Sequence, residues 1–128
     1  MVRLVIAVIF TIIFFTIIFN TALTGDFEDG MAAYDRKDYA TALEKFLSAA
    51  EQGNAAAQSN LGVLYLEGQG VARDYTRAHM WFHIAAVSGH KPSERGRDLA
   101  ASKMTAQQIE QAQRMARECR RSNFTKCE

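Results

Sequence analysis

The feature that most constrains the fold of this chain is a sequence pattern that occurs twice at a fixed offset. Residues 38–42 read Asp-Tyr-Ala-Thr-Ala, and residues 74–78, which begin 36 positions later, read Asp-Tyr-Thr-Arg-Ala. Further matches at the same offset are Phe46 with Phe82, Ala49 and Ala50 with Ala85 and Ala86, and Gly53 with Gly89. A period of this length is typical of arrays in which each unit is a helical hairpin. We therefore predict a helix-turn-helix array.

The spacing of apolar residues predicts helices throughout the region after Asp26. Apolar side chains recur three and four positions apart, which places them on one face of a helix. The region has no alternating apolar and polar stretch long enough for a strand, and Pro92 is its one proline. Breaks between helices are expected at residues 36–38, Gly53–Asn54, Gly68–Gly70, Gly89–Pro92 and before the Thr105–Gln108 capping pair.

The second copy contains an additional loop, Gly68-Gln69-Gly70. Tyr34 therefore corresponds to Tyr65 at the shorter offset of 31. One helical hairpin cannot bury its apolar stripe alone, so neighbouring hairpins must stack and the last one must cap the array. A final helix with arginines on its outer face suits that cap. The pattern predicts an all-α fold of stacked hairpins.

The N-terminal segment has the layout of an export signal or a membrane anchor. Residues 4–19 are apolar except for Thr11 and Thr16, Arg3 precedes them, and no charged residue follows until Asp26. A helix of this stretch is roughly 24 Å long, whereas residues 4–23 reach the approximately 30 Å of a bilayer core. Both a cleaved signal and a retained single span that contacts the membrane stay open. Either one predicts an extracytoplasmic location, in the periplasm or cell envelope.

The charge balance argues against a nucleic-acid partner. The chain has 15 basic and 14 acidic residues, and loss of Arg3 with the N-terminal segment leaves 14 of each. Binding to nucleic acid requires several cations that make phosphate contacts. We expect no nucleic-acid binding.

Both cysteines, Cys119 and Cys127, lie within the last ten residues. In an exported protein an even number of cysteines favours a disulfide. The short loop between these two would hold the C-terminus in place rather than join distant parts of the fold. Two free thiols are the alternative.

Between residues 57 and 89, small and aromatic residues occupy the positions of a known repeat motif. They are Ala57, Leu61, Gly62, Tyr65, Gly68, Gly70, Val71, Asp74, Ala78, Trp81, Ala85, Ala86 and Gly89. With these residues the region resembles a complete Sel-1-like repeat, a branch of the tetratricopeptide superfamily. The resemblance implies a short right-handed α-solenoid of about three antiparallel helix pairs, preceded by the apolar N-terminal signal or anchor helix. It also implies that these motif residues build the scaffold and that the protein is an adaptor without catalytic or cofactor residues.

The same resemblance divides the chain. Residues 1–25 form the signal peptide or anchor, and residues 26–121 form the repeat domain. Within that domain, residues 26–53 resemble a shortened repeat, 54–89 a full repeat and 90–121 a degenerate capping pair. Residues 122–128 form a tail that the disulfide would hold.

The sequence contains few residues whose spacing suggests a catalytic or metal-binding site. His79 and His83 lie four apart on one predicted helix, a spacing that can place two imidazoles on one metal ion. No third ligand is evident nearby in the sequence, so we assign no metal and no cofactor. The Gly68–Gly70 loop follows no strand and is not followed by Lys-Ser or Lys-Thr, so it is interpreted as a turn rather than a phosphate loop.

Helical solenoids bind partners on the concave face, which the first helix of each pair lines. Positions off the packing stripe on those helices form the candidate partner surface. They are Tyr34, Arg36, Asn60, Val63 and Glu67. Arg114, Arg117 and Arg121 share one face of the last helix and suggest an anionic surface, although a basic C-terminal turn also follows from the helix dipole.

These observations favour a non-enzymatic adaptor of the cell envelope that binds a protein or peptide segment. The motif repeats, and no reactive cluster accompanies it. One alternative is a membrane-anchored accessory subunit whose apolar segment is its working part. A metal-dependent hydrolase that uses His79 and His83 is the other.

Overall fold

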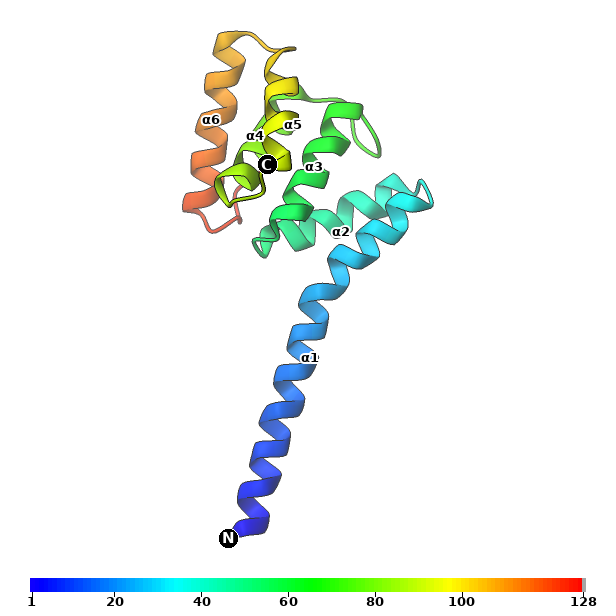
Figure 1. Ribbon diagram of the computed structural model, residues 1–128, viewed down its shortest axis with the longest axis vertical. Helices are drawn as coiled ribbons and strands as arrows, with labels where there is room; N and C mark the ends of the chain where they lie inside the picture. The colour runs from blue at the N-terminus through cyan, green and yellow to red at the C-terminus, as the bar shows by residue number, and fades with distance from the viewer. Residues whose placement is uncertain (128) are drawn as a thin grey trace.

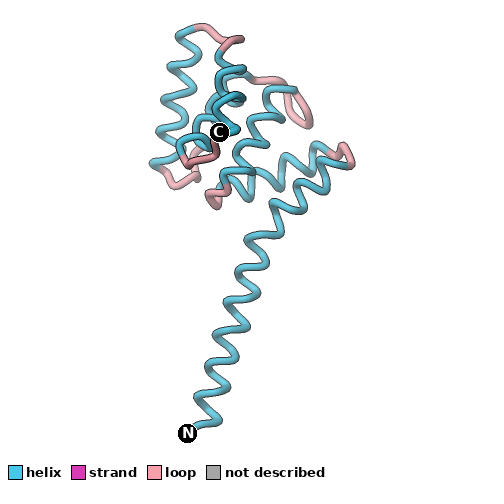
Figure 2. The backbone as a smooth tube through the Cα atoms, in the orientation of Figure 1, coloured by secondary structure: helices cyan, strands magenta, loops and turns pink. Residues whose placement is uncertain are grey.

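The chain folds into helices joined by short turns (Figures 1 and 2). The computed structural model describes the backbone of residues 1–127 and the side chains of residues 1–13 and 25–127. No strand occurs in residues 1–127, which confirms the prediction of an all-α fold. The helices are α1 (Val2–Asp35), α2 (Tyr39–Glu51), α3 (Ala55–Glu67), α4 (Tyr75–Val87), α5 (Pro92–Ala101) and α6 (Ala106–Arg121).

Most of these helices begin at a side chain that caps the first turn. Asp38 accepts a hydrogen bond from the backbone N–H of Thr41, and Asp74 accepts one from that of Arg77. Asn54 caps α3 in the same way, at 2.9 Å. These caps satisfy N–H groups that have no partner within the helix. The capping box of Thr105 and Gln108 is also present, so the predicted helix starts are confirmed.

The end of α1 packs against α2, and α3 packs against α4, as two hairpins (Figure 1). The third unit differs from a regular pair. Both α5 and α6 pack against α4, and α5 also contacts α3. The capping pair predicted over residues 90–121 is therefore two helices that cover α4 separately.

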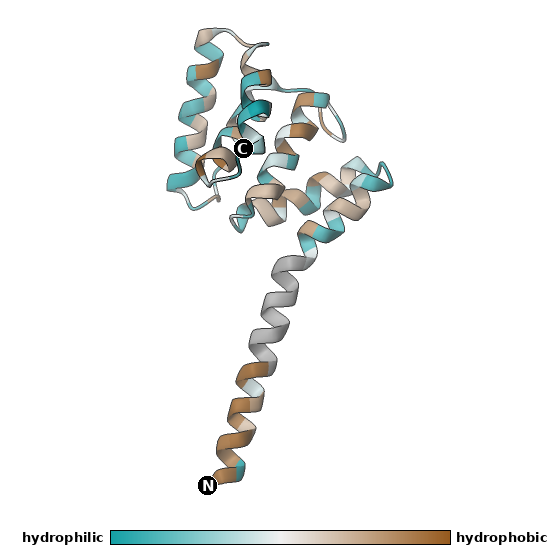
Figure 3. Cartoon of the chain, viewed as in Figure 1, coloured by the Kyte–Doolittle hydropathy of each residue, from teal (hydrophilic) through white to brown (hydrophobic). Residues whose placement is uncertain are grey.

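Helix α1 is one continuous helix from Val2 to Asp35 (Figure 1). The N-terminal segment and the first helix of the first hairpin are thus parts of the same element. Part of the predicted apolar span, residues 14–24, lies outside the described side chains. Among the described residues, no helix has the length and apolarity needed to cross a membrane. The apolar side chains among residues 1–13 are exposed. Figure 3 shows that this end of α1 is largely hydrophobic.

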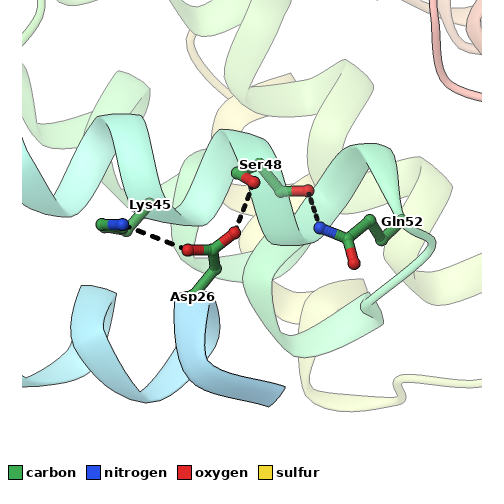
Figure 4. Close-up of polar contacts among 4 residues, drawn as sticks. All are labelled: Asp26, Lys45, Ser48 and Gln52. Carbon is green, nitrogen blue, oxygen red and sulfur yellow. Dashed lines mark hydrogen bonds and ion pairs between the residues drawn. The ribbon is translucent and has the colours of Figure 1, made fainter. Parts of the chain in front are cut away.

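A carboxylate joins α1 to α2 at the point where α1 enters the repeat domain (Figure 4). Asp26 lies 3.1 Å from the Lys45 ammonium and accepts a 2.6 Å hydrogen bond from the Ser48 hydroxyl. The hydrogen bonds from Ser48 and Lys45 hold the pKa of Asp26 below its usual value. Phe27 continues the contact, with its ring 6.1 Å from that of Phe46.

Phenylalanine rings pack against glycines of neighbouring helices. A Cβ atom on Gly62 of α3 would lie 2.7 Å from the Phe82 ring of α4, and one on Gly96 of α5 would lie 2.5 Å from the same ring. Gly30 of α1 has the same relation to Phe46 of α2, at 2.7 Å. These glycines allow the helix backbones to approach closely while both rings are buried.

The extra loop of the second repeat closes against the first repeat. Gly70 has a φ of 70°, and a Cβ atom there would lie 2.5 Å from the carbonyl oxygen of Tyr39. A side chain at this position would therefore be strained by its backbone angle and would also collide with the start of α2. The loop therefore contacts the first repeat, in addition to forming the turn between α3 and α4.

The C-terminal tail folds back after α6. Cys119 and Cys127 are joined by a disulfide, in agreement with the sequence prediction. Between them, Phe124 packs against the core and lies near the α2–α3 turn, 3.6 Å from the position of a Cβ on Gly53. The tail therefore connects the last helix to the turn between the first two hairpins.

Replacement of Gly62 by alanine tests the glycine–phenylalanine contact. We expect Gly62→Ala to lower the free energy of unfolding by about 1–2 kcal/mol, because the Phe82 ring must move to admit the methyl group. The matched control is Gly25→Ala, which places a methyl group in a helix with no atom within 4 Å. That change should be neutral or stabilising by up to about 1 kcal/mol. Equal effects of the two changes, measured by urea unfolding, would contradict the contact.

Candidate functional site

The five residues of the candidate partner surface lie on α1 and α3. Tyr34 is half-buried, with its ring 5.3 Å from that of Tyr39 and its hydroxyl donating a 3.4 Å hydrogen bond to Gln69. Burial raises the pKa of Tyr34, and the neighbouring Tyr39 and Glu67 raise it further. Tyr34 of α1 and Glu67 of α3 are therefore close enough to interact electrostatically.

Asn60 connects the same two helices. Its amide nitrogen lies 3.2 Å from the sulfur of Met31, which is on α1. Val63 is half-buried against the core, and Glu67 is exposed at the end of α3. Arg36 is exposed where α1 ends. The structure thus places Tyr34, Asn60 and Glu67 on one face that α1 and α3 share. Some of the polar groups of these residues already make contacts within the protein.

A hollow of about 220 Å³ continues from Glu67 toward α5. Its lining combines apolar and charged side chains: Leu66, Glu67, Arg73, Tyr75, Leu99 and Lys103. Leu99, the one large apolar residue of α5, is 52% exposed. Sequence reasoning missed this hollow because it is formed by three segments that meet only in the fold.

The repeat-motif residues lie beneath this face and build the scaffold. Ala57, Leu61, Ala78, Trp81 and Ala85 are fully buried. The glycines at positions 68, 70 and 89 have positive φ angles at turns, which glycine adopts without strain. These positions therefore hold the helices together instead of presenting groups to a partner.

His79 and His83 stack against each other on α4. Their ring centroids are 6.2 Å apart and the rings are nearly parallel, at 11°. His79 is 3% exposed, and its Nδ1 atom has no hydrogen-bond partner in the described structure. Among the described residues, no group of three His, Cys, Asp or Glu side chains is arranged to hold a metal ion. The pair is thus part of the packed interior of α4 and the helices that cover it.

The surroundings of this pair disfavour a positive charge. Burial lowers the pKa of His79 below its usual 6.5, and the adjacent His83 and Arg97 lower it further, while Asp98 acts in the opposite direction. Burial also lowers the pKa of His83, as do Arg97 of α5 and both Arg120 and Arg117 of α6. The neutral form of both imidazoles is therefore favoured, and arginines from two covering helices lie near them.

Comparison with known proteins gives a consistent result. The family model described as Sel1 repeat matches residues 27–54 and 55–90. One similar solved structure is that of c5321, described as a protective antigen present in uropathogenic Escherichia coli strains that displays an SLR fold. It superimposes with a TM-score of 0.73 at 31% sequence identity over 80% of this chain. The match covers 24% of that chain, so this protein spans about a quarter of its length.

The histidine pair predicts a loss of stability in mild acid. Because the folded-state pKa values of His79 and His83 are lowered, the unfolded chain binds more protons as the pH falls below about 6.5. The free energy of unfolding should be highest above pH 6.5 and should decrease from there toward pH 5. That interval lies above the titration of Asp26, whose pKa is lowered from 3.8.

Thermal unfolding between pH 5 and pH 8 measures this dependence. We expect His79→Gln to flatten it, since glutamine does not titrate. The control is His90→Gln. His90 lies at the turn before α5, so its replacement leaves the stacked pair intact. A pH dependence that His79→Gln does not change would show that these histidines are not its source.

Proposed function

The chain belongs to the Sel1 repeat family, and from this membership we propose that it is a non-catalytic adaptor that binds another protein at the cell envelope. The observation that carries the proposal is the stacking of two matched repeats, in which α2 packs against α3 and Asn60 of α3 contacts Met31 of α1 on the candidate face. The motif residues are occupied in packing, which leaves the exposed residues of that face for a partner. Stacked helical hairpins present extended surfaces of this kind in other repeat proteins. We further propose that the array is a short right-handed solenoid.

The proposed binding face is the surface formed by Tyr34, Arg36, Asn60, Val63 and Glu67 together with the adjoining hollow. It contains the features that protein interfaces favour: a tyrosine, an arginine and partly exposed apolar side chains. An exposed Leu99 beside Glu67 offers an apolar contact next to a charge. A peptide segment with an apolar anchor would complement this arrangement.

The location at the envelope is proposed from the N-terminus. Residues 4–19 are almost wholly apolar and follow Arg3. Their described side chains, through residue 13, are exposed in the isolated chain. Apolar surface of this extent is costly in water and is expected to be covered. We propose that this segment carries the chain across the membrane, either as a cleaved signal or as a retained anchor.

Photocrosslinking in cells tests the binding face. A photoreactive phenylalanine analogue in place of Glu67 or Arg36, both exposed, should yield covalent adducts of discrete mass with a partner. The same analogue in place of Glu44 on α2, which is also exposed, is the matched control and should yield none. Equal labelling at all three positions, or no adduct at any of them, would count against this face as the site of binding.

The mass of the protein recovered from fractionated cells tests the location. A chain shortened at its N-terminus in the periplasm indicates a cleaved signal, and a full-length chain in the membrane fraction indicates an anchor. A full-length chain in the soluble cytoplasmic fraction would contradict the proposed location. The same measurement reports the disulfide, which removes two hydrogens from the mass.

A further inference from the structure

A second surface, distinct from the face of α1 and α3, lies at the C-terminal end of α6. It is a hollow of about 630 Å³, which is within the range of roughly 300–1,000 Å³ that ligand sites occupy. Its lining consists of Arg114, Arg117, Glu118, Arg121, Ser122 and Lys126. Four of these side chains are cationic and one is a carboxylate. The hollow is therefore strongly basic, whereas the chain as a whole has a formal charge of +1.

Two features of α6 place these charges. Arg114, Arg117 and Arg121 recur at intervals of three and four, so they share one face of the helix. Arg114 forms an ion pair with Glu110 at 2.9 Å, which directs it along the helix. Arg117 and Arg121 lie one turn apart, with a rise of about 6 Å between them.

The disulfide brings the fourth cation to the hollow. After α6 the chain reverses through Asn123 and Phe124, both of which have positive φ angles. The backbone N–H of Lys126 then donates a 2.9 Å hydrogen bond to the Ser122 hydroxyl, and Cys127 is buried in its bond with Cys119. Lys126 is thus held against the end of α6 by a covalent link one residue away. A second hollow of about 410 Å³ adjoins the first at Lys126 and Glu118.

We propose that this basic hollow binds an acidic peptide segment of a partner protein. This proposal rests on the adaptor function proposed above, and it specifies that one segment of the partner is acidic. Arginine forms paired hydrogen bonds with carboxylates, and these bonds are among the strongest polar contacts in proteins. Alternate side chains of an extended peptide lie on one side about 6.6 Å apart, which is close to the spacing of Arg117 and Arg121. Two acidic residues separated by one position would therefore meet Arg117 and Arg121.

The extent of the site favours a peptide over a single small anion. One phosphate ion would occupy a small part of 630 Å³. A peptide strand with several carboxylates uses both the volume and the distribution of charge.

Fluorescence anisotropy of a labelled peptide tests the proposal on the full chain held in neutral detergent. The probe is an octapeptide in which glutamate alternates with serine, and its control is the same peptide with lysine in place of glutamate. We expect the glutamate peptide to bind and the lysine peptide not to bind, with an affinity that decreases as salt is added. Absence of glutamate-peptide binding at low salt would overturn the proposal.

Paired substitutions locate the binding. Arg117→Gln combined with Arg121→Gln should weaken the affinity about tenfold or more, since each lost charged hydrogen bond is comparable to a tenfold factor. The matched control, Lys91→Gln with Arg95→Gln, removes the same charge from other exposed positions and should change the affinity by less than about twofold. Equal losses in the two double variants would mean that net charge alone attracts the peptide, and would overturn the site.

The disulfide provides an independent arm. Cys119→Ser with Cys127→Ser should release Lys126 from the end of α6 and lower the affinity for the glutamate peptide. Circular dichroism checks that this variant retains its helices. If this folded variant binds as tightly as the parent, the tail does not contribute to the site. Lys126→Gln keeps the disulfide and should show a smaller loss in the same direction. An unchanged affinity in Lys126→Gln would likewise remove the tail from the proposal.

Competition distinguishes the two sources of anionic groups. Glycerol phosphate, the soluble part of an anionic lipid headgroup, should displace the peptide only at much higher concentration than an unlabelled glutamate peptide. The reverse order would assign the hollow to lipid phosphate and overturn the proposal. If the peptide fails to bind while Glu67 still crosslinks to a partner, the adaptor function stands and only this inference fails.

Discussion

The packing of Phe82 between two glycines is the contact on which the rest of the structure depends. Gly62 of α3 and Gly96 of α5 each leave the space of a side chain, and the ring of Phe82 occupies it from α4. One aromatic ring therefore holds three helices, and Gly30 with Phe46 repeats the arrangement in the first hairpin. Close packing of this kind leaves little tolerance for added volume, so each contact fixes the distance between neighbouring helices.

This constraint determines what the surface can present. Because the rings and alanines face inward, the outward positions of α1 and α3 form a face that is free to vary without loss of the scaffold. The same separation explains why the motif residues indicate a fold but not a partner. At the other end, the disulfide and Phe124 join the tail to the α2–α3 turn. The basic hollow on α6 is thereby attached to the array through a short, covalently closed loop.

Much of the fold was predictable because its signals are local. Asp38, Asp74 and Thr105 act on backbone groups within three residues, so their capping roles follow from the sequence alone. The positions of Gly30 and Gly96 were not predicted, since a glycine inside a helix is informative only when the ring that fills its space is known. The sequence also did not predict that α6 packs on α4 rather than on α5, because that contact joins helices that are not consecutive in the chain. Helix α1 also continues through the boundary expected at residue 25. For the candidate site, the sequence placed Tyr34, Asn60 and Glu67 on the first helices of their pairs, and it placed the arginines of α6 on one face. The hollow beside Glu67 was not predictable, because its lining comes from segments that meet only after folding. The place of Lys126 beside those arginines likewise depends on how the tail folds back.

Cooperativity of unfolding is the most direct measure of whether the glycine–phenylalanine contacts unite the repeats. Trp81 is the one tryptophan of the chain, and it is fully buried on α4 beside Phe82. Urea unfolding of the full chain in neutral detergent can be followed by Trp81 fluorescence and, in parallel, by hydrogen exchange of the α2 amides in the first hairpin. We expect the two transitions to coincide in midpoint and slope, because the hairpins are interlocked. Unfolding of α2 at a clearly lower urea concentration than the loss of Trp81 burial would show that the repeats fold independently and that no such interlock exists.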